Sequence, residues 1–171
     1  VLENEKQLNT VVVRCALARR WPPFVPALLK AAQSPASAVR LEALRTLEVM
    51  ATPAEAESLV AILSQTMPGP ERAAADRAVW MSCRRNSDPA VRSAPLLAAL
   101  EKADVAARTA LLPTLGRLGG NTSLDAVHAA MRSPDQAVRD AGYRALANWP
   151  DASVADELLQ IAKTTAVPSY R

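Results

Sequence analysis

The sequence predicts an all-α fold in which about five helical hairpins stack into a right-handed α-α superhelix. Half of the 171 residues are apolar but only 4% are aromatic, so alanine and leucine must fill the core, as they do between closely packed helices. No segment alternates apolar and polar residues with the period of two that indicates a β-strand. A pattern typical of a helix start recurs at intervals of about 31 to 35 residues, which indicates a repeat architecture.

The clearest copy of this pattern runs from Ser133 to Pro150. Ser133 suits an N-cap, Pro134 suits the first helical position, and Asp135 adds negative charge to the first turn. Apolar side chains then recur on one helical face until Pro150 ends the segment. The same order of residues is found at 34–47, with weaker copies at 69–71 and 102–104.

Two kinds of helix alternate along the chain. The first kind is predicted at 23–33, 53–66, 89–101, 121–132 and 151–163, and the second kind at 5–20, 35–50, 70–85, 103–118 and 134–148. Prolines mark most of the breaks, and Gly119-Gly120 suits the left-handed end of a helix. A Trp-Pro break at Trp21 and again at Trp149 relates the first repeat to the last. Hairpins this short cannot bury their apolar faces alone, so they must stack on one another.

The segment Ser-Pro-Asp-Gln-Ala-Val-Arg-Asp-Ala-Gly-Tyr-Arg-Ala-Leu, residues 133–146, resembles the second helix of HEAT repeats of the short bacterial type. The resemblance covers nearly the whole chain and implies a single HEAT-like repeat domain over residues 1–171. The Trp-Pro-Asp break, the Gly-Arg-Leu-Gly-Gly segment and the closing Lys-Thr-Thr-Ala-Val-Pro-Ser-Tyr-Arg resemble HEAT regions of large multidomain bacterial proteins. Residues 166–171 match the opening of another second-type helix, so we expect this domain to be a fragment of a longer chain.

Composition argues against several classes of function. The net charge of +3 is too small to indicate a nucleic-acid-binding protein by itself. Cys15 and Cys83 lie two repeats apart, too far for a disulfide, and are expected to be buried. One histidine, His128, cannot supply a multi-histidine metal site, and no catalytic set is apparent, so we expect no cofactor, no metal and no enzymatic activity. No stretch approaches the roughly 20 apolar residues of a membrane span, so no membrane insertion is expected.

Some arginines are expected to have structural roles. Asp104 with Arg108, and Asp135 with Arg139, have the i,i+4 spacing of ion pairs on a helix surface. In HEAT repeats, an Asp and an Arg at these places form a ladder that links neighbouring repeats. The resemblance therefore implies a structural role for Arg40, Arg108 and Arg139.

A candidate binding surface lies opposite the apolar stripe of the second-type helices. The residues predicted there are Arg45, Arg77, Trp80, Arg84 and Arg144. Second helices line the concave side of a HEAT-like solenoid, so we expect Arg77, Trp80 and Arg84 to form the centre of a partner-binding strip. Trp and Arg are the residue types enriched at binding hot spots. The alternative is that Trp80 packs between repeats.

The expected function is that of a non-catalytic protein-binding or scaffolding module. Its partner would be a protein, a peptide or a neighbouring domain of the same chain. One alternative is a nucleic-acid-binding module, because a family of DNA alkylation-repair enzymes is also built from HEAT-like repeats. The mild charge and the few aromatic residues argue against a nucleic-acid partner. A further alternative is an accessory domain of an enzyme whose active site lies outside this fragment.

Overall fold

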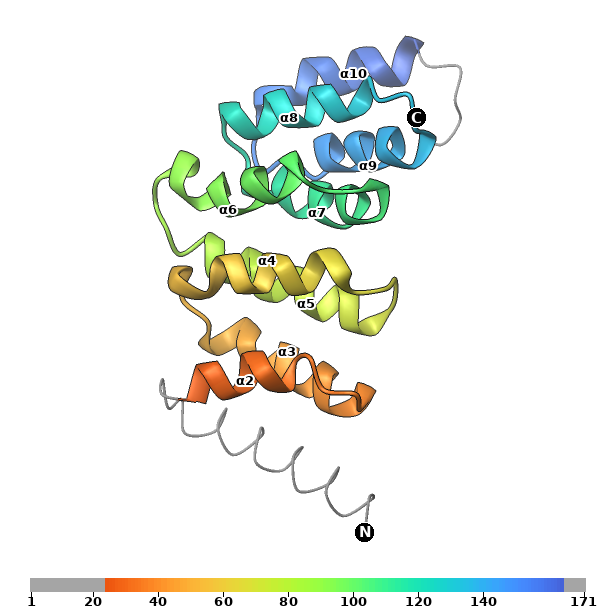
Figure 1. The fold of residues 1–171 in the computed structure, drawn as a ribbon. Helices are drawn as coiled ribbons and strands as arrows, with labels where there is room; N and C mark the ends of the chain where they lie inside the picture. Colours follow the sequence, from red (N-terminus) through yellow and green to blue (C-terminus); the bar gives the residue numbers. More distant parts are fainter. Residues whose placement is uncertain (1–23, 165–171) are drawn as a thin grey trace. The chain divides into compact units, whose positions relative to one another are not determined.

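The computed structural model describes residues 24–164, which belong to two compact units, 24–87 and 88–164. The described residues form nine α-helices and two short 3₁₀ helices, and contain no β-strand (Figure 1). The first unit contains α2 (Val25–Ala31), α3 (Ser37–Met50), η2 (Pro53–Glu55), α4 (Ala56–Gln65) and α5 (Pro70–Cys83). The second unit contains α6 (Pro89–Glu101), α7 (Val105–Leu118), α8 (Asn121–Met131), α9 (Gln136–Ala147), η3 (Ala152–Val154) and α10 (Ala155–Thr164).

Helices that follow one another in the sequence pack as pairs, α2 with α3 and α4 with α5 in the first unit, α6 with α7 and α8 with α9 in the second. The second helices of successive pairs also pack on each other, α3 on α5 and α7 on α9. This is the packing of HEAT-like repeats, and the predicted all-α fold of the α-α solenoid class is confirmed. The helix predicted at 5–20 lies outside the described residues.

Several helices, among them α3, α7 and α9, begin two residues later than the sequence pattern predicted. The N-cap of α9 is Asp135, whose Oδ1 accepts a hydrogen bond from the Val138 N–H at 3.1 Å. The hydroxyl of Ser133, predicted as the N-cap, instead accepts from the Asp135 N–H at 3.2 Å. A carboxylate is the stronger acceptor for first-turn N–H groups, so the helix begins after Asp135. In the related segment of the first unit, Ser34 likewise accepts from the Ala36 N–H, and α3 begins at Ser37.

Small residues let the second helices approach closely. A Cβ atom added at Gly116 of α7 would lie 2.1 Å from the carbonyl oxygen of Ala145 in α9, well inside contact distance. A Cβ atom at Gly142 would lie 2.8 Å from the backbone nitrogen of Met131. In each unit the core consists mostly of leucines and alanines that are almost completely buried, including Leu47, Leu59, Leu63, Ala74 and Ala78 in the first unit and Leu111, Leu115, Ala141 and Leu146 in the second. The expectation that alanine and leucine fill the core is therefore confirmed.

Arginines hold the loops of the hairpins. Arg40 donates from one terminal nitrogen to the carbonyls of Ser34 and Pro35, at 2.8 and 2.9 Å. Arg139 makes the same two contacts with Ser133 and Pro134, at 2.6 and 2.7 Å. These carbonyls precede the helix and lack helical partners, so the guanidinium replaces the hydrogen bonds that they would otherwise make with water.

One of these arginines also links neighbouring repeats, as the resemblance implied. The Nε of Arg40 lies 2.7 Å from Oε2 of Glu71 in α5, and a second nitrogen lies 2.9 Å from Oε1. Asp104 and Asp135, the predicted partners of Arg108 and Arg139, cap their own helices instead. Arg108 and Arg139 therefore bind loop carbonyls, through the Arg108 Nε to Ala103 and the Arg139 terminal nitrogen to Ser133 and Pro134.

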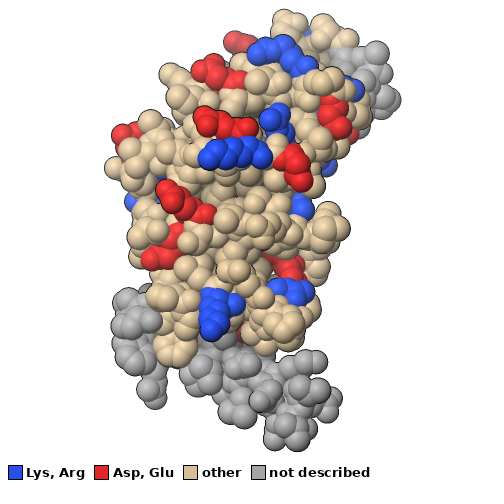
Figure 2. All heavy atoms as spheres, viewed as in Figure 1, with Lys and Arg blue, Asp and Glu red and all other residues tan. Residues whose placement is uncertain are grey.

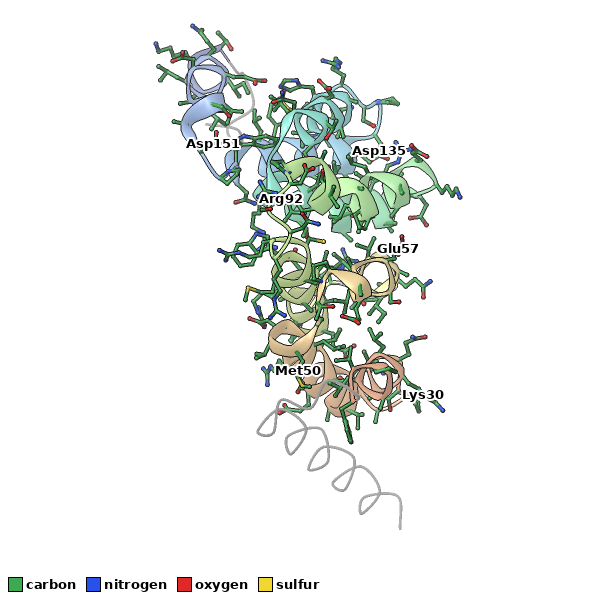
Figure 3. The ribbon with its side chains drawn as sticks, turned by 90° about the vertical axis from the view of Figure 1, so that its left-hand side faces the viewer. Lys30, Met50, Glu57, Arg92, Asp135 and Asp151 are labelled. Carbon is green, nitrogen blue, oxygen red and sulfur yellow. The ribbon has the colours of Figure 1, made fainter. Side chains whose placement is uncertain are left out.

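Two arginines from neighbouring segments cap the C-terminal ends of second helices. Arg85 donates to the carbonyls of Ala51 and Val49 at the end of α3, at 2.6 and 2.7 Å. Arg92 of α6, labelled in Figure 3, donates to the carbonyl of Leu118 at the end of α7. A positive charge at a helix C-terminus is favourable because it opposes the helix dipole.

Replacing Gly116 by alanine should destabilise the fold. Helix propensity alone favours alanine by about 1 kcal/mol, but the close approach of the Ala145 carbonyl should cost about 2–3 kcal/mol or more. The net effect on the free energy of unfolding, measured by urea denaturation, should therefore be negative. Replacing the exposed Ala137 of α9 by glycine measures the contribution of helix propensity alone, because this side chain lies on the surface. A stabilised Gly116→Ala protein would show that α7 and α9 do not approach this closely.

Replacing Glu71 by glutamine should change how stability depends on acidity. The hydrogen bond from Arg40, opposed by partial burial, holds the pKa of the Glu71 carboxyl below its ordinary value. A carboxyl of this kind stabilises the folded state above its unfolded pKa, and the contribution is lost as the pH falls through the folded pKa. We expect the unchanged protein to lose more stability than Glu71→Gln as the pH falls below about 5.

The measurement is the urea midpoint of both proteins at neutral pH and in acid. Glu57 of α4, an exposed carboxylate labelled in Figure 3, provides the matched control as Glu57→Gln. Parallel loss of stability in Glu71→Gln and the unchanged protein would contradict the proposed contribution of the ion pair.

Candidate partner-binding surface

An ion pair joins α3 and α5 at the predicted surface. The Nε of Arg77 lies 3.0 Å from Oε2 of Glu48, and the two side chains are 44% and 30% exposed. Arg77 and Glu48 belong to the second helices of neighbouring repeats, so their ion pair links these two helices at the surface. Exposed pairs of this kind add little stability, so the pair mainly orients Arg77.

The aromatic residue of the surface is covered by a cation. The guanidinium carbon of Arg84 lies 4.3 Å from the centre of the Trp80 ring, within the range of a cation–π contact. Trp80 is half-buried, and Arg84, the C-cap residue of α5, is exposed one helical turn later. The sequence left two alternatives for Trp80, a partner-binding residue or a residue packed between repeats. Its half-burial is intermediate between them, because the ring is neither fully exposed nor part of the core.

Arg45 extends this surface along α3. Its side chain is 55% exposed, and a terminal nitrogen lies 3.9 Å from Oε2 of Glu42. Arg45 precedes Glu48 by three residues, so the two share one face of α3. We call Arg45, Glu48, Arg77, Trp80 and Arg84 the Arg–Trp surface. Arg144, the fifth predicted residue, is an exposed residue of α9 in the second unit and is described separately from these.

Positive and negative charges are balanced over the described part of the chain. Residues 24–164 contain fifteen lysines and arginines and fifteen aspartates and glutamates, so the net charge of +3 comes from the residues outside this range. Figure 2 shows both kinds of charge interspersed on the face that it draws. A nucleic-acid-binding surface requires a concentrated basic stripe, and this distribution does not provide one on that face.

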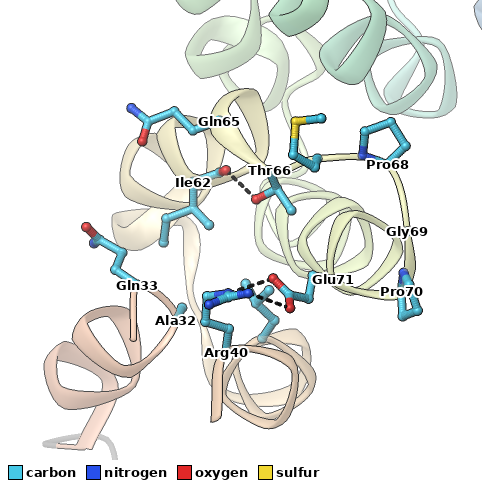
Figure 4. A pocket seen from close by; sticks show the side chains of 12 residues that line it. Ala32, Gln33, Arg40, Ile62, Gln65, Thr66, Pro68, Gly69, Pro70 and Glu71 are labelled. Atoms are coloured by element: carbon cyan, nitrogen blue, oxygen red, sulfur yellow. Dashed lines mark hydrogen bonds and ion pairs between the residues drawn. The ribbon is translucent and has the colours of Figure 1, made fainter. Parts of the chain in front are cut away.

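Each unit contains a groove between its successive hairpins. The groove of the first unit, about 570 Å³, is lined by the end of α2, by Arg40 and Leu44 of α3, and by residues from Ile62 to Glu71 (Figure 4). The Arg40–Glu71 ion pair crosses it. The groove of the second unit, about 400 Å³, is lined by Leu97, Leu100, Glu101, Arg108, Leu112, Ala126, Ala130 and Val138.

The remaining candidate groups are structural. Nε2 of His128 in α8 lies 3.0 Å from Oε2 of Glu157 in α10, so this side chain links two helices. Cys83 is buried, as expected, and burial raises the pKa of its thiol to about 11, so it is a poor nucleophile. Cys15 lies outside the described residues.

Over residues 24–164 no group of histidine, cysteine and carboxylate side chains could hold a metal ion. The described helices are all too short or too polar to cross a membrane.

Comparison with known families identifies the repeat type. The HEAT repeats family matches the chain over residues 93–171. Together with the paired helices, this match supports a HEAT-repeat protein. Searches of curated proteins and of solved structures found no match. HEAT repeats are generally protein-interaction and scaffold modules and are typically non-catalytic.

The sequence analysis did not predict the two glutamates that pair with Arg77 and Arg40. Glu48 and Glu71 pair with Arg77 and Arg40 over separations of 29 and 31 residues, close to one repeat length. Opposite charges that recur one repeat apart on second-type helices were therefore an available signal. The contacts of Arg85 were not predicted, because its acceptors lie at the end of the preceding second helix, more than 30 residues earlier in the chain.

Proposed function

We propose that this chain is a non-catalytic protein-binding module that contacts its partner through the Arg–Trp surface. The observation that carries the proposal is the arrangement around Trp80. A half-buried indole, covered by Arg84 and adjoined by the Glu48–Arg77 pair, offers a large amphipathic contact area with charged groups beside it. Tryptophan and arginine in such a setting are the side chains whose loss most often weakens binding.

The charges of this surface favour a protein partner. Arg45 lies near Glu42 and Arg77 pairs with Glu48, so part of the positive charge is neutralised within the first unit. A protein partner can complement a mixed surface of this kind, with acidic groups placed against Arg84 and apolar groups against Trp80. A nucleic acid would instead require several cations aligned on successive phosphates. Arg45 is proposed as an outer contact of this surface, and Arg144 as a separate contact on the second unit.

Selection of peptides from a random display library against the whole chain, residues 1–171, tests this function. Recovered peptides should be rich in acidic residues, and Trp80→Ala should weaken their binding by about 2 kcal/mol or more, roughly thirtyfold. Arg84→Gln should weaken it less, because the indole keeps most of its contact area. The measurement is fluorescence anisotropy with a labelled copy of each selected peptide.

Two controls separate binding from folding. Arg132→Gln changes an exposed arginine at the C-cap of α8 and should leave the affinity of these peptides unchanged. Urea denaturation should show that Trp80→Ala remains folded, because a half-buried ring leaves a smaller cavity than a core residue. Unchanged peptide affinity in Trp80→Ala would contradict the proposal. Tight binding of a short DNA duplex that weakens steeply with salt would favour the nucleic-acid alternative.

A further inference from the structure

The groove of the second unit differs in chemistry from that of the first. Six of its lining residues are apolar and come from four helices: Leu97, Leu100, Leu112, Ala126, Ala130 and Val138. Only two charged residues line it, Arg108 near the start of α7 and Glu101 at the end of α6. The groove therefore combines an apolar surface with one cation and one anion.

The first unit shows what an arginine at this position binds. Arg40 and Arg108 are both the fourth residue of a second helix, and both line a groove between hairpins. In the first unit, Glu71 in the first turn of α5 supplies a carboxylate that takes two guanidinium nitrogens of Arg40, at 2.7 and 2.9 Å. The other terminal nitrogen binds the Ser34 and Pro35 carbonyls, so all three nitrogens are engaged.

The second unit supplies no such carboxylate from its own described residues. The first turn of α9 carries no acidic residue, and the preceding Asp135 caps that helix through the Val138 N–H. Arg108 is exposed, and its hydrogen bond within residues 24–164 is made by Nε, to the Ala103 carbonyl at 3.0 Å. Its two terminal nitrogens keep the fork geometry that binds a carboxylate through two hydrogen bonds.

We propose that this groove binds a short peptide segment of a partner protein in which an apolar side chain lies next to a single carboxylate. The carboxylate takes the two terminal nitrogens of Arg108, because its Nε already binds the Ala103 carbonyl, whereas Glu71 takes Nε and one terminal nitrogen of Arg40. The apolar side chain lies against Leu97, Leu112 and Ala126. Glu101 repels a second carboxylate, so the groove discriminates against polyacidic segments. This site is separate from the Arg–Trp surface and does not depend on the function proposed for it.

A defined peptide tests the site. The probe is a fluorescein-labelled, end-blocked peptide, Ser-Gly-Leu-Glu-Leu-Gly-Ser, measured by anisotropy against the whole chain. A groove that accepts one or two side chains should bind it with a Kd of about 10–500 µM. Changing the peptide glutamate to glutamine, or Arg108→Gln in the protein, should each raise the Kd by about tenfold. Making both changes together should raise it little further, because each removes the same contact.

Matched variants show where the peptide binds. Ala126→Phe fills the apolar part of the groove and should raise the Kd by about tenfold or more, with thermal unfolding checked in parallel. Arg132→Gln, which removes an exposed arginine outside the groove lining, should change the Kd by less than about twofold. Trp80→Ala should have no effect, which keeps this test distinct from that of the Arg–Trp surface.

Three results would overturn the proposal. The first is no binding of the probe up to about 2 mM, beyond the range expected for such a groove. The second is equal affinity for the glutamate and glutamine peptides. The third is an unchanged Kd in Arg108→Gln, which is expected to fold because the arginine is exposed and makes one hydrogen bond to the loop.

Discussion

The close approach of successive second helices is the constraint on which the structure depends. Where α7 meets α9, Gly116 lies against the backbone of Ala145 with no space for a Cβ atom between them. Helices at this separation exclude large side chains from the contact itself, so the leucines gather beside it and the charged residues are displaced to the edges. The surface residues of the second helices are therefore positioned by a backbone contact.

Arginines have several structural roles around these helix contacts. Arg40 and Arg139 satisfy loop carbonyls, Arg85 caps the end of α3, and Arg77 pairs across to Glu48. The planar guanidinium can bind several carbonyl or carboxylate oxygens at once, which lysine cannot do. These arginines therefore stabilise the folded structure. Arginines whose guanidinium groups face the solvent are the better candidates for binding a partner.

The sequence predicted the fold more fully than the surface. Proline positions and apolar periodicity located the helices of residues 24–164 to within a few residues, because these signals act over one or two turns. The start of α9 was placed early, because Ser133 and Asp135 both resemble caps and their competition depends on loop geometry. The sequence placed Arg77, Trp80 and Arg84 on one helix, but the contact of Arg84 with the Trp80 ring and the pairing of Arg77 with Glu48 depend on side-chain directions and helix pairing. Whether these residues bind a partner depends on a second molecule, which one sequence does not describe.

The glycine contact also bears on whether the hairpins of this protein are interchangeable. Eight residues after the loop-binding arginine, α7 carries Gly116, whereas α3 carries Glu48 at the corresponding position after Arg40. In α3 that glutamate is needed to hold Arg77, and in α7 any side chain would collide with α9. A hairpin moved from one unit to the other would therefore clash or lose its ion pair. The hairpins share one pattern, but α3 and α7 each carry a residue that fits only the helix packed against it, so these two hairpins are not interchangeable.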